Sequence, residues 1–115
     1  MNTYHKGILA EHLAKTVMLL KGFIPREHRF KTPVGEIDLI MESVSTVAFI
    51  EVKRRQNFRG AAESISASQQ RRIARAAAFY LQKNPNKGLK RARFDVILVN
   101  RWGFLQHVKN AFFAE

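Results

Sequence analysis

Two short runs, residues 35–40 and 49–53, constrain the fold most, because each places charged side chains inside an otherwise apolar segment. Both runs alternate with a period of two, which is typical of β-strands. Between them lie residues 43–46, Ser-Val-Ser-Thr, which suit a tight reversal of the chain. The sequence therefore predicts an antiparallel hairpin whose register is centred on Val44 and Ser45.

The predicted register brings two acids together. Asp38 lies opposite Glu51, with Cβ atoms about 5 Å apart, and Lys53 follows on the face of Glu51. Two carboxylates at this separation repel each other, and a hard divalent cation is the natural counter-charge. A slip of one residue would separate the acids. Only the centred register, however, gathers the apolar residues on the opposite face, namely Ile37, Leu39, Met41, Ala48, Ile50 and Val52.

The lysine also has a purely structural interpretation. The same register places Glu36 across from Lys53, and the two could form a cross-strand ion pair with no role in chemistry. Both interpretations of Lys53 stay open at this level.

The charge of the chain indicates what it binds. Its 115 residues suffice for one domain, expected to span 1–115, and 20 Lys and Arg against 9 Asp and Glu give a net charge of +11. Such a surface attracts polyanions, nucleic acid first among them. No apolar run could span a membrane, residues 1–20 lack the apolar core of a signal peptide, and there is no cysteine. We therefore expect a cytoplasmic protein without disulfides.

The remaining pattern predicts two helices and further strands. Residues 6–21 form an amphipathic helix with one apolar face, and residues 23–31 an edge strand. A second helix begins after Ser66 or Ser68 and runs to Leu81. Residues 93–99 form a buried strand, and the strand–helix–strand order implies a parallel neighbour. The aromatic tail, 102–113, packs as a last strand or turn. The apolar face of the first helix is expected to comprise Ile8, Leu9, Leu13, Val17 and Leu20.

Several charged residues have two interpretations each. Glu11, on the first helix, is either a surface acid or reaches over the end of the sheet toward the metal. Asp95 is best explained structurally, as a partner of Arg91 or Arg93 or of backbone amides. The basic residues after the hairpin and on the second helix form either a solvated face or one that follows a phosphate backbone, and they comprise Arg54, Arg55, Arg59, Arg71, Arg72 and Arg75.

These motifs together resemble the YraN family, small bacterial proteins regarded as predicted nucleases. The resemblance rests on the helix with Glu11, on runs 35–40 and 49–54, on Gln70-Arg71-Arg72-Ile73, on Arg93-Phe94-Asp95-Val96 and on the closing segment 107–112, and it spans nearly the whole chain. The family is similar to archaeal Holliday-junction resolvases and to the restriction-endonuclease-like PD-(D/E)xK superfamily. It implies an α/β fold with order αβββαβ, in which helices flank a mixed central sheet made of an antiparallel hairpin and a parallel strand.

The resemblance also implies a chemistry. Asp38 and Glu51, with the backbone carbonyl of Val52, would bind Mg²⁺, for which Mn²⁺ could substitute, and Lys53 would assist the attacking water. Glu11 matches the helix acid that completes many resolvase-like sites. Gln69 stands where a lysine is expected and joins the basic residues as a nucleic-acid contact. The implied activity is hydrolysis of DNA, branched or structured DNA included, with a homodimer as one arrangement. A non-catalytic nucleic-acid-binding or accessory module is the alternative.

Overall fold

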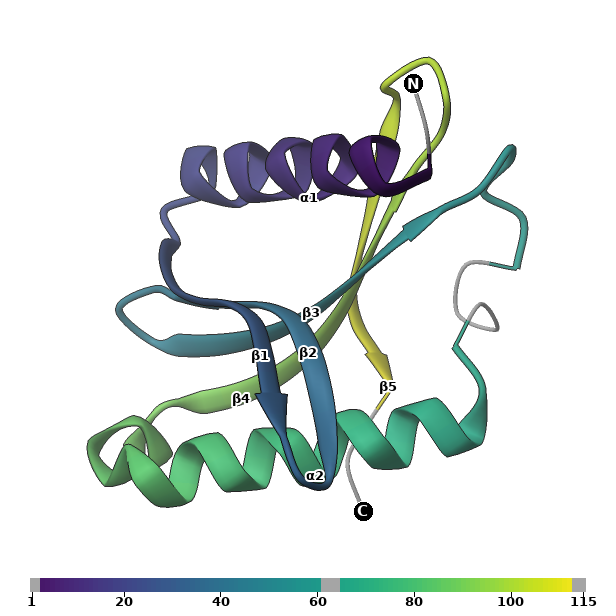
Figure 1. Cartoon of the computed structure of the whole chain (residues 1–115). Helices are drawn as coiled ribbons and strands as arrows, with labels where there is room; N and C mark the ends of the chain where they lie inside the picture. Colours follow the sequence, from purple (N-terminus) through teal and green to yellow (C-terminus); the bar gives the residue numbers. More distant parts are fainter. Residues whose placement is uncertain (1–2, 61–64, 113–115) are drawn as a thin grey trace.

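The computed structural model describes residues 3–60 and 65–112, with side chains from Lys6 onward. Phe113, the last residue of the predicted closing segment, lies outside these ranges. The elements follow the order α1, β1, β2, β3, α2, the short 3-10 helix η2, β4 and β5 (Figure 1). Their bounds are α1 Thr3–Leu20, β1 Ile24–Thr32, β2 Gly35–Glu42, β3 Thr46–Arg54, α2 Ala67–Lys83, η2 Pro85–Leu89, β4 Arg91–Val99 and β5 Leu105–Phe112.

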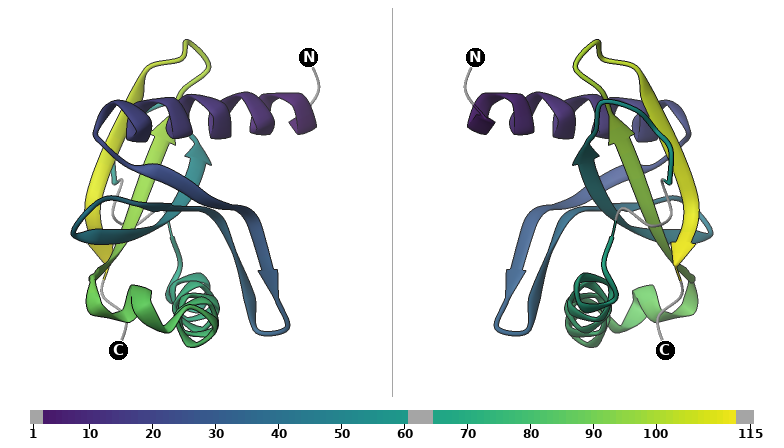
Figure 2. Two further views of the ribbon diagram at one scale, coloured as in Figure 1. Left: turned by 90° about the vertical axis from the view of Figure 1, so that its left-hand side faces the viewer. Right: turned by 90° about the vertical axis from the view of Figure 1, so that its right-hand side faces the viewer.

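The sheet has five strands in the order β1-β2-β3-β4-β5. Neighbouring strands are antiparallel except β3 and β4, which are parallel because α2 carries the chain back between them. The α/β class and the mixed sheet are as predicted, and the tail adds β5 as an outer strand. Helix α1 lies on one face of the sheet and α2 on the other (Figure 2).

Each face of the sheet has its own core. On the α2 side, the Phe49 ring packs on those of Tyr80 and Phe94, with centroids 6.0 and 5.4 Å away. On the α1 side, Met18 packs against strand residues that include Leu39 and Ile50. The Ser66 hydroxyl caps α2 by accepting a hydrogen bond from the Gln69 amide, which fixes where this helix begins.

The predicted apolar face of α1 is wrong in part. The helix buries Ala10, Ala14 and Met18, whereas Leu9 and Leu13 are exposed. Helical spacing alone favoured the leucines because they are the larger apolar residues. The alanines face the sheet because their small side chains let the helix axis approach it closely. This approach buries the long Met18 side chain between the helix and the sheet. Exposed leucines consequently remain on the outer side of α1, and Leu20 is among them.

The hairpin register is the predicted one near the turn. The Ser43 amide donates to the Thr46 carbonyl at 2.8 Å, and the pairs Met41–Ala48 and Leu39–Ile50 follow from it. The pairing of β2 with β3 stops at Leu39–Ile50, because β2 bends away with β1 toward α2 (Figure 2).

That bend corrects two further expectations. Ile37 packs in the α2-side core, not beside Leu39, so the alternation of faces breaks at Asp38. Arg29, on the neighbouring strand, has a φ of +52° at the same level, which marks the distortion of the ladder. Glu36 is also outside the β2–β3 ladder, so the predicted pairing with Lys53 does not form in this register.

Gly35 allows the bent hairpin to approach α2, and we expect Gly35→Ala to destabilise the protein. A Cβ atom here would collide with the backbone carbonyl oxygen of Arg72. Neither backbone can yield easily, so the expected loss is about 1–3 kcal/mol of unfolding free energy, measured by urea denaturation. Gly7→Ala is the matched control, since a Cβ there meets nothing within 4 Å and the change suits a helix. Equal stability of the two variants would contradict the close approach.

Candidate active site

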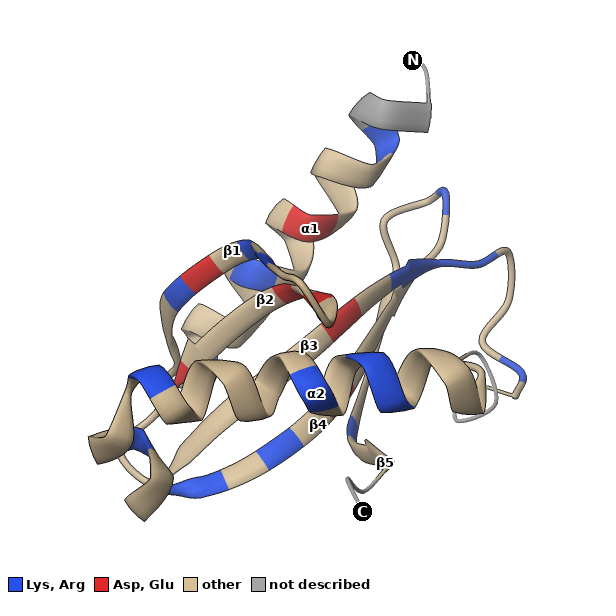
Figure 3. Ribbon diagram, turned by 60° about the horizontal axis from the view of Figure 1, so that its bottom comes forward, with Lys and Arg blue, Asp and Glu red and all other residues tan. Residues whose placement is uncertain are grey.

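Asp38 and Glu51 meet where β2 begins to leave β3. Glu51 follows Phe49 on the α2-facing side of β3 and is 9% exposed. Its carboxyl group lies close enough to that of Asp38 for each to shift the pKa of the other, and Asp38 Oδ2 accepts a hydrogen bond from the Val52 amide at 2.8 Å. Figure 3 shows acidic positions on β2 and β3 close together near α2. Because the β2–β3 ladder ends here, the Val52 amide donates to the Asp38 carboxylate instead of to a backbone carbonyl of β2.

Burial and mutual repulsion perturb both acids. Burial, followed by the charge on Asp38, raises the pKa of Glu51 to about 8, although Lys53 lowers it. Burial also raises the pKa of Asp38, against the hydrogen bonds from Val52 and Glu51. The pair therefore holds a proton at neutral pH, and a divalent cation would displace that proton.

Two further side chains contact Glu51. Lys53 Nζ lies 3.5 Å from Glu51 Oε1, and Gln69 Nε2 donates to the same oxygen at 3.3 Å. The ion pair of Lys53 is thus with Glu51 of its own strand. The lysine side chain is 21% exposed, so it is partly open to solvent.

Two cavities open onto Asp38, and they share Glu36 as well. The smaller, about 60 Å³, lies toward α2, and the larger, about 260 Å³, lies toward α1 and β1. Cations line both of them, so an anion could approach the acids from either side. The smaller is lined by Glu36, Asp38, Glu51, Gln69, Arg72 and Ile73, and the larger by Glu11, Arg29, Lys31, Glu36, Ile37 and Asp38.

Glu11 lies at the larger cavity but is held by β1. Its Oε1 is 2.9 Å from His28 Nε2 and accepts from Arg29 Nε at 3.2 Å, and the side chain is 13% exposed. Its charge contributes to the raised pKa of Asp38. Glu11 is therefore no ordinary surface acid: it lines the same cavity as Asp38 and holds the His28 and Arg29 side chains of the edge strand.

The structure divides the predicted basic residues into groups. Gln69 and Arg72 reach the smaller cavity with the acids. Arg71 and Arg75 are exposed along α2, and Arg59 is exposed in the loop after β3. Arg54 and Arg55 line a separate cavity beyond the end of β3. The candidate site thus joins the acids to α2, whereas the basic run after Lys53 leads elsewhere.

Sequence reasoning missed the part of the site that β1 supplies. Arg29 and Lys31 line the larger cavity, and Glu36 lines both cavities. The dense charges of 26–31 in a strand paired with the acidic one were the available signal. The bend that turns these residues toward Asp38 could not be predicted, because position 29 is an arginine and not a glycine or proline.

The donor set limits which metal could bind. Within the described part of the chain, no three His, Cys, Asp or Glu side chains are grouped to hold a metal ion. Two carboxylates suit Mg²⁺, which keeps several waters and completes its shell with substrate phosphates. In an extended strand the amide and carbonyl of one residue point to the same side. Because the Val52 amide points to Asp38, its carbonyl is directed to that side too.

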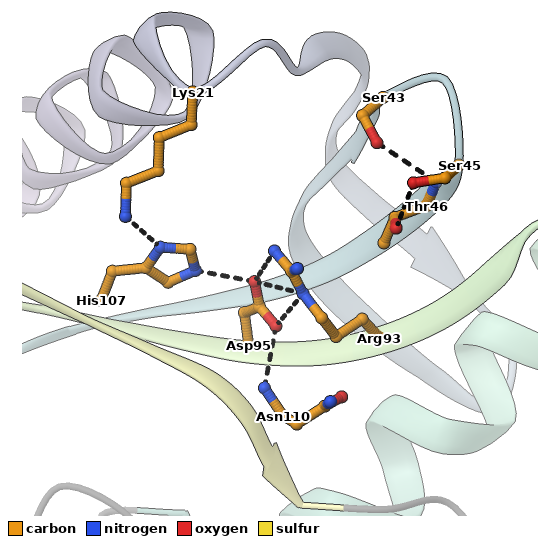
Figure 4. Close-up of polar contacts among 8 residues, drawn as sticks. All are labelled: Lys21, Ser43, Ser45, Thr46, Arg93, Asp95, His107 and Asn110. Atoms are coloured by element: carbon orange, nitrogen blue, oxygen red, sulfur yellow. Dashed lines mark hydrogen bonds and ion pairs between the residues drawn. The ribbon is translucent and has the colours of Figure 1, made fainter.

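Asp95 lies in a separate network on the α1 side of the sheet (Figure 4). Its oxygens accept from Arg93 Nε and Nη2, both at 2.9 Å, and from the Asn110 amide at 3.2 Å. His107 Nε2 is 2.7 Å away, and Lys21 Nζ lies 2.8 Å from His107 Nδ1. Burial opposes the charge, but these hydrogen bonds together lower the pKa of Asp95. The predicted structural role of Asp95 agrees with this geometry.

The fold and the site together define a class: an α/β protein with a mixed five-stranded sheet between two helices, and with a buried Glu and a half-buried Asp beside a lysine. In the described residues, no helix is long and apolar enough to cross a membrane. The chain belongs to the family described as Uncharacterised protein family UPF0102, whose profile matches residues 10–99. This membership confirms the resemblance to the YraN family.

Relatives from bacteria match over nearly the whole chain. A UPF0102 protein of Chelativorans sp. (strain BNC1) is 42% identical over 113 residues, which cover 96% of this chain and 90% of that protein. A UPF0102 protein of Methylorubrum extorquens (strain PA1) is 39% identical over 113 residues, covering 98% and 88%. The names of these relatives do not state an activity.

Proposed function

We propose that this protein is a Mg²⁺-dependent nuclease that hydrolyses phosphodiester bonds in DNA, branched or structured DNA included. The observation that carries the proposal is that Asp38 and Glu51 line one cavity and perturb each other's pKa, with Lys53 Nζ 3.5 Å from Glu51. Buried like charges are costly for stability, and titratable groups perturbed in this way gather at functional sites. DNA as substrate would place the activity in the cytoplasm.

The carboxylates of Asp38 and Glu51 and the carbonyl of Val52 would hold the ion. Mg²⁺, or Mn²⁺ in its place, supplies charge to the scissile phosphate and lowers the pKa of a bound water. The hydrogen bond from the Val52 amide fixes the orientation of Asp38, and Gln69 Nε2 does the same for Glu51. The chain thereby presents its two acids in a defined geometry before any ligand arrives.

Lys53 and Arg72 would act on the phosphate. Lys53, next to Glu51 and partly open to solvent, would orient the attacking water or stabilise the charge that develops on the phosphate. Arg72 lines the same cavity and supplies a second cation. Glu11 would act indirectly, because it holds His28 and Arg29 at the neighbouring cavity.

The exposed cations of α2 would bind the DNA backbone. Arg71 and Arg75 extend the cationic surface from Arg72 along the helix, which runs beside the acids (Figure 3). Contacts to phosphates carry no base specificity, so binding should be independent of sequence and steeply dependent on salt. Cutting both strands at a junction symmetrically would require a homodimer, since each chain would bring its own Asp38–Glu51 pair to one strand.

The test is cleavage of a panel of labelled branched, nicked, single-stranded and duplex DNAs with Mg²⁺, Mn²⁺ or EDTA. We expect metal-dependent cleavage that falls about 10²–10³-fold in Lys53→Ala, because an aligned positive charge is lost at the transition state. Lys109→Ala is the matched control, an exposed lysine on β5 with the same loss of charge.

The alternative, a non-catalytic nucleic-acid-binding module, makes the opposite prediction. DNA binding with no cleavage under either metal, unchanged by Lys53→Ala, would overturn the nuclease proposal. Cleavage that persists equally in Lys53→Ala and Lys109→Ala would indicate a contaminating nuclease. The preparations must therefore be purified in parallel.

A further inference from the structure

The turn between β4 and β5 presents two aromatic rings to solvent. Trp102 is 71% exposed and Phe104 69%. The Asn100 side-chain oxygen accepts from the amides of both residues, at 2.9 and 3.0 Å, and Gly103 supplies the left-handed φ of +83° that closes the turn. The rings are thus displayed by a turn whose backbone is held by its own hydrogen bonds.

Two cavities lie beside this turn, and Trp102 lines the larger of them together with apolar residues of α1. One, about 470 Å³, lies between the turn and the first half of α1, and the other, about 300 Å³, lies over the end of β3. Their cations are Lys6, Arg54, Arg55 and Arg101, and among the described residues no acid lines either cavity. The Arg101 guanidinium lies over the Trp102 ring, 4.7 Å from its centroid.

We propose that this surface, named here the Trp102 surface and made of Lys6, Arg54, Arg55, Arg101, Trp102 and Phe104, binds a single-stranded segment of nucleic acid. Sites for single strands combine a cationic groove for the backbone with aromatic rings on which bases stack. The faces of paired bases are covered inside a duplex, so rings at the tip of a turn can stack only on unpaired bases. The four cations match the charge of the phosphates.

The surface continues from the candidate active site, and in this respect the inference rests on the proposed function. Arg54 follows Glu51 by three residues on β3, which corresponds to about 10 Å along the strand. It pairs in register with Val99, directly before the turn, and the Arg55 amide donates to the Val99 carbonyl at 3.0 Å. Arg54 lies on the α1 side of β3 and Glu51 on the α2 side, so a nucleic acid held at Asp38 and Glu51 would pass round the end of β3 to reach Trp102. The substrate class is DNA with unpaired nucleotides next to the point of cleavage, such as a flap or a splayed arm.

The single tryptophan of the chain makes the inference directly measurable. The full chain carrying Asp38→Asn, which would prevent turnover by the proposed nuclease, is titrated with oligothymidylate, with blunt duplex and with heparin as a polyanion without bases. We expect oligothymidylate to quench tryptophan fluorescence saturably, because a base stacked on Trp102 deactivates its excited state. Duplex and heparin should bind without comparable quenching.

Variants then separate stacking from charge. In anisotropy titrations, Trp102→Ala and Phe104→Ala should each weaken binding of the single strand about 5- to 100-fold and that of the duplex less than about twofold. Leu89→Ala, an equally apolar and 90% exposed residue on η2, should change neither affinity. Equal losses for single strand and duplex, quenching by heparin, or stronger quenching by an acidic peptide than by oligothymidylate would each overturn the inference.

The result of this binding test does not depend on whether the protein cleaves DNA. If the wild type cleaves no DNA but the single-strand preference and its dependence on Trp102 hold, the nuclease proposal fails and the Trp102 surface stands. If cleavage is found but the single strand neither quenches nor depends on Trp102, the nuclease stands and this surface falls.

Discussion

If the proposed function holds, Glu51→Gln should reduce metal-dependent cleavage at least about 10³-fold, because it removes one of the two carboxylates that would hold the ion. Glutamine keeps the size of the side chain, and its oxygen can still accept the hydrogen bond from Gln69, so the loss reports on charge. The measurement is the single-turnover rate on the substrate that the wild type cuts best. Glu27→Gln, an exposed residue of β1 with the same change, is the control and should cleave like the wild type.

The same variant should be more stable than the wild type at alkaline pH. The pKa of Glu51 rises from 4.5 to about 8 on folding. Between these values the folded protein binds more protons than the unfolded chain, so the unfolding free energy of the wild type falls as pH rises through this window, by up to about 5 kcal/mol. The glutamine of the variant has no such proton to lose, and the difference in stability should grow from pH 5 to pH 9.

Urea denaturation in EDTA across this pH range measures that difference, and Mg²⁺ provides the link to function. At pH 8, Mg²⁺ should raise the melting temperature of the wild type and not that of Glu51→Gln, because only the wild type offers the paired carboxylates. A variant that is less stable than the wild type at pH 8 without metal would contradict the burial of a repelling pair.

The hairpin was predictable because its rules are local. The two-residue turn after Ser43 and the alternation next to it fix one register as far as Leu39–Ile50, and Asp38 and Glu51 come next to that last pair. The parallel pairing of β3 and β4 follows from the length of chain that α2 must span. These elements carry the two acids and Lys53, which explains why the centre of the candidate site could be predicted.

The rest depended on packing between elements. The sequence favours Leu9 and Leu13 as the buried face of α1, and only the closeness of helix and sheet selects Ala10 and Ala14 instead. The bend of the β1–β2 hairpin at Arg29 moves Ile37 to the other core. The Trp102 surface joins α1, the end of β3 and the β4–β5 turn, which no spacing in the sequence relates. Long-range approaches of this kind leave no periodic signal.

Asp95→Ala should produce the largest loss of stability, about 3–5 kcal/mol of unfolding free energy. The carboxylate is fully buried, and its removal leaves the guanidinium of Arg93, 12% exposed, and the His107 ring, 3% exposed, without their acceptor. It also leaves the Asn110 amide, which tethers β5 to β4, without its hydrogen-bond acceptor. Urea denaturation at pH 7 measures the loss, and Asp95→Asn, which keeps an acceptor without the charge, should lie between wild type and alanine.

Acid should reveal the same interaction. Because the pKa of Asp95 is lowered on folding, its contribution is present above the unfolded value of 3.8 and disappears as pH falls toward the folded value. The stability gap between wild type and Asp95→Asn should therefore close on acidification, whereas the gap for Glu51→Gln opens toward alkaline pH.

Cleavage rates should distinguish the role of Asp95 from that of Glu51, as the pH dependence of stability does. Asp95 lies on the α1 side of the sheet and Glu51 on the α2 side, so at a low temperature, where the folded fraction of both variants can be matched, Asp95→Asn should cut DNA at nearly the wild-type rate per folded molecule. A double-mutant cycle with His107→Gln should give a coupling energy of about 1–3 kcal/mol, since the two side chains share a hydrogen bond. Additive losses in that cycle, or a loss of cleavage without a loss of stability, would show that Asp95 acts in catalysis and not in holding β5.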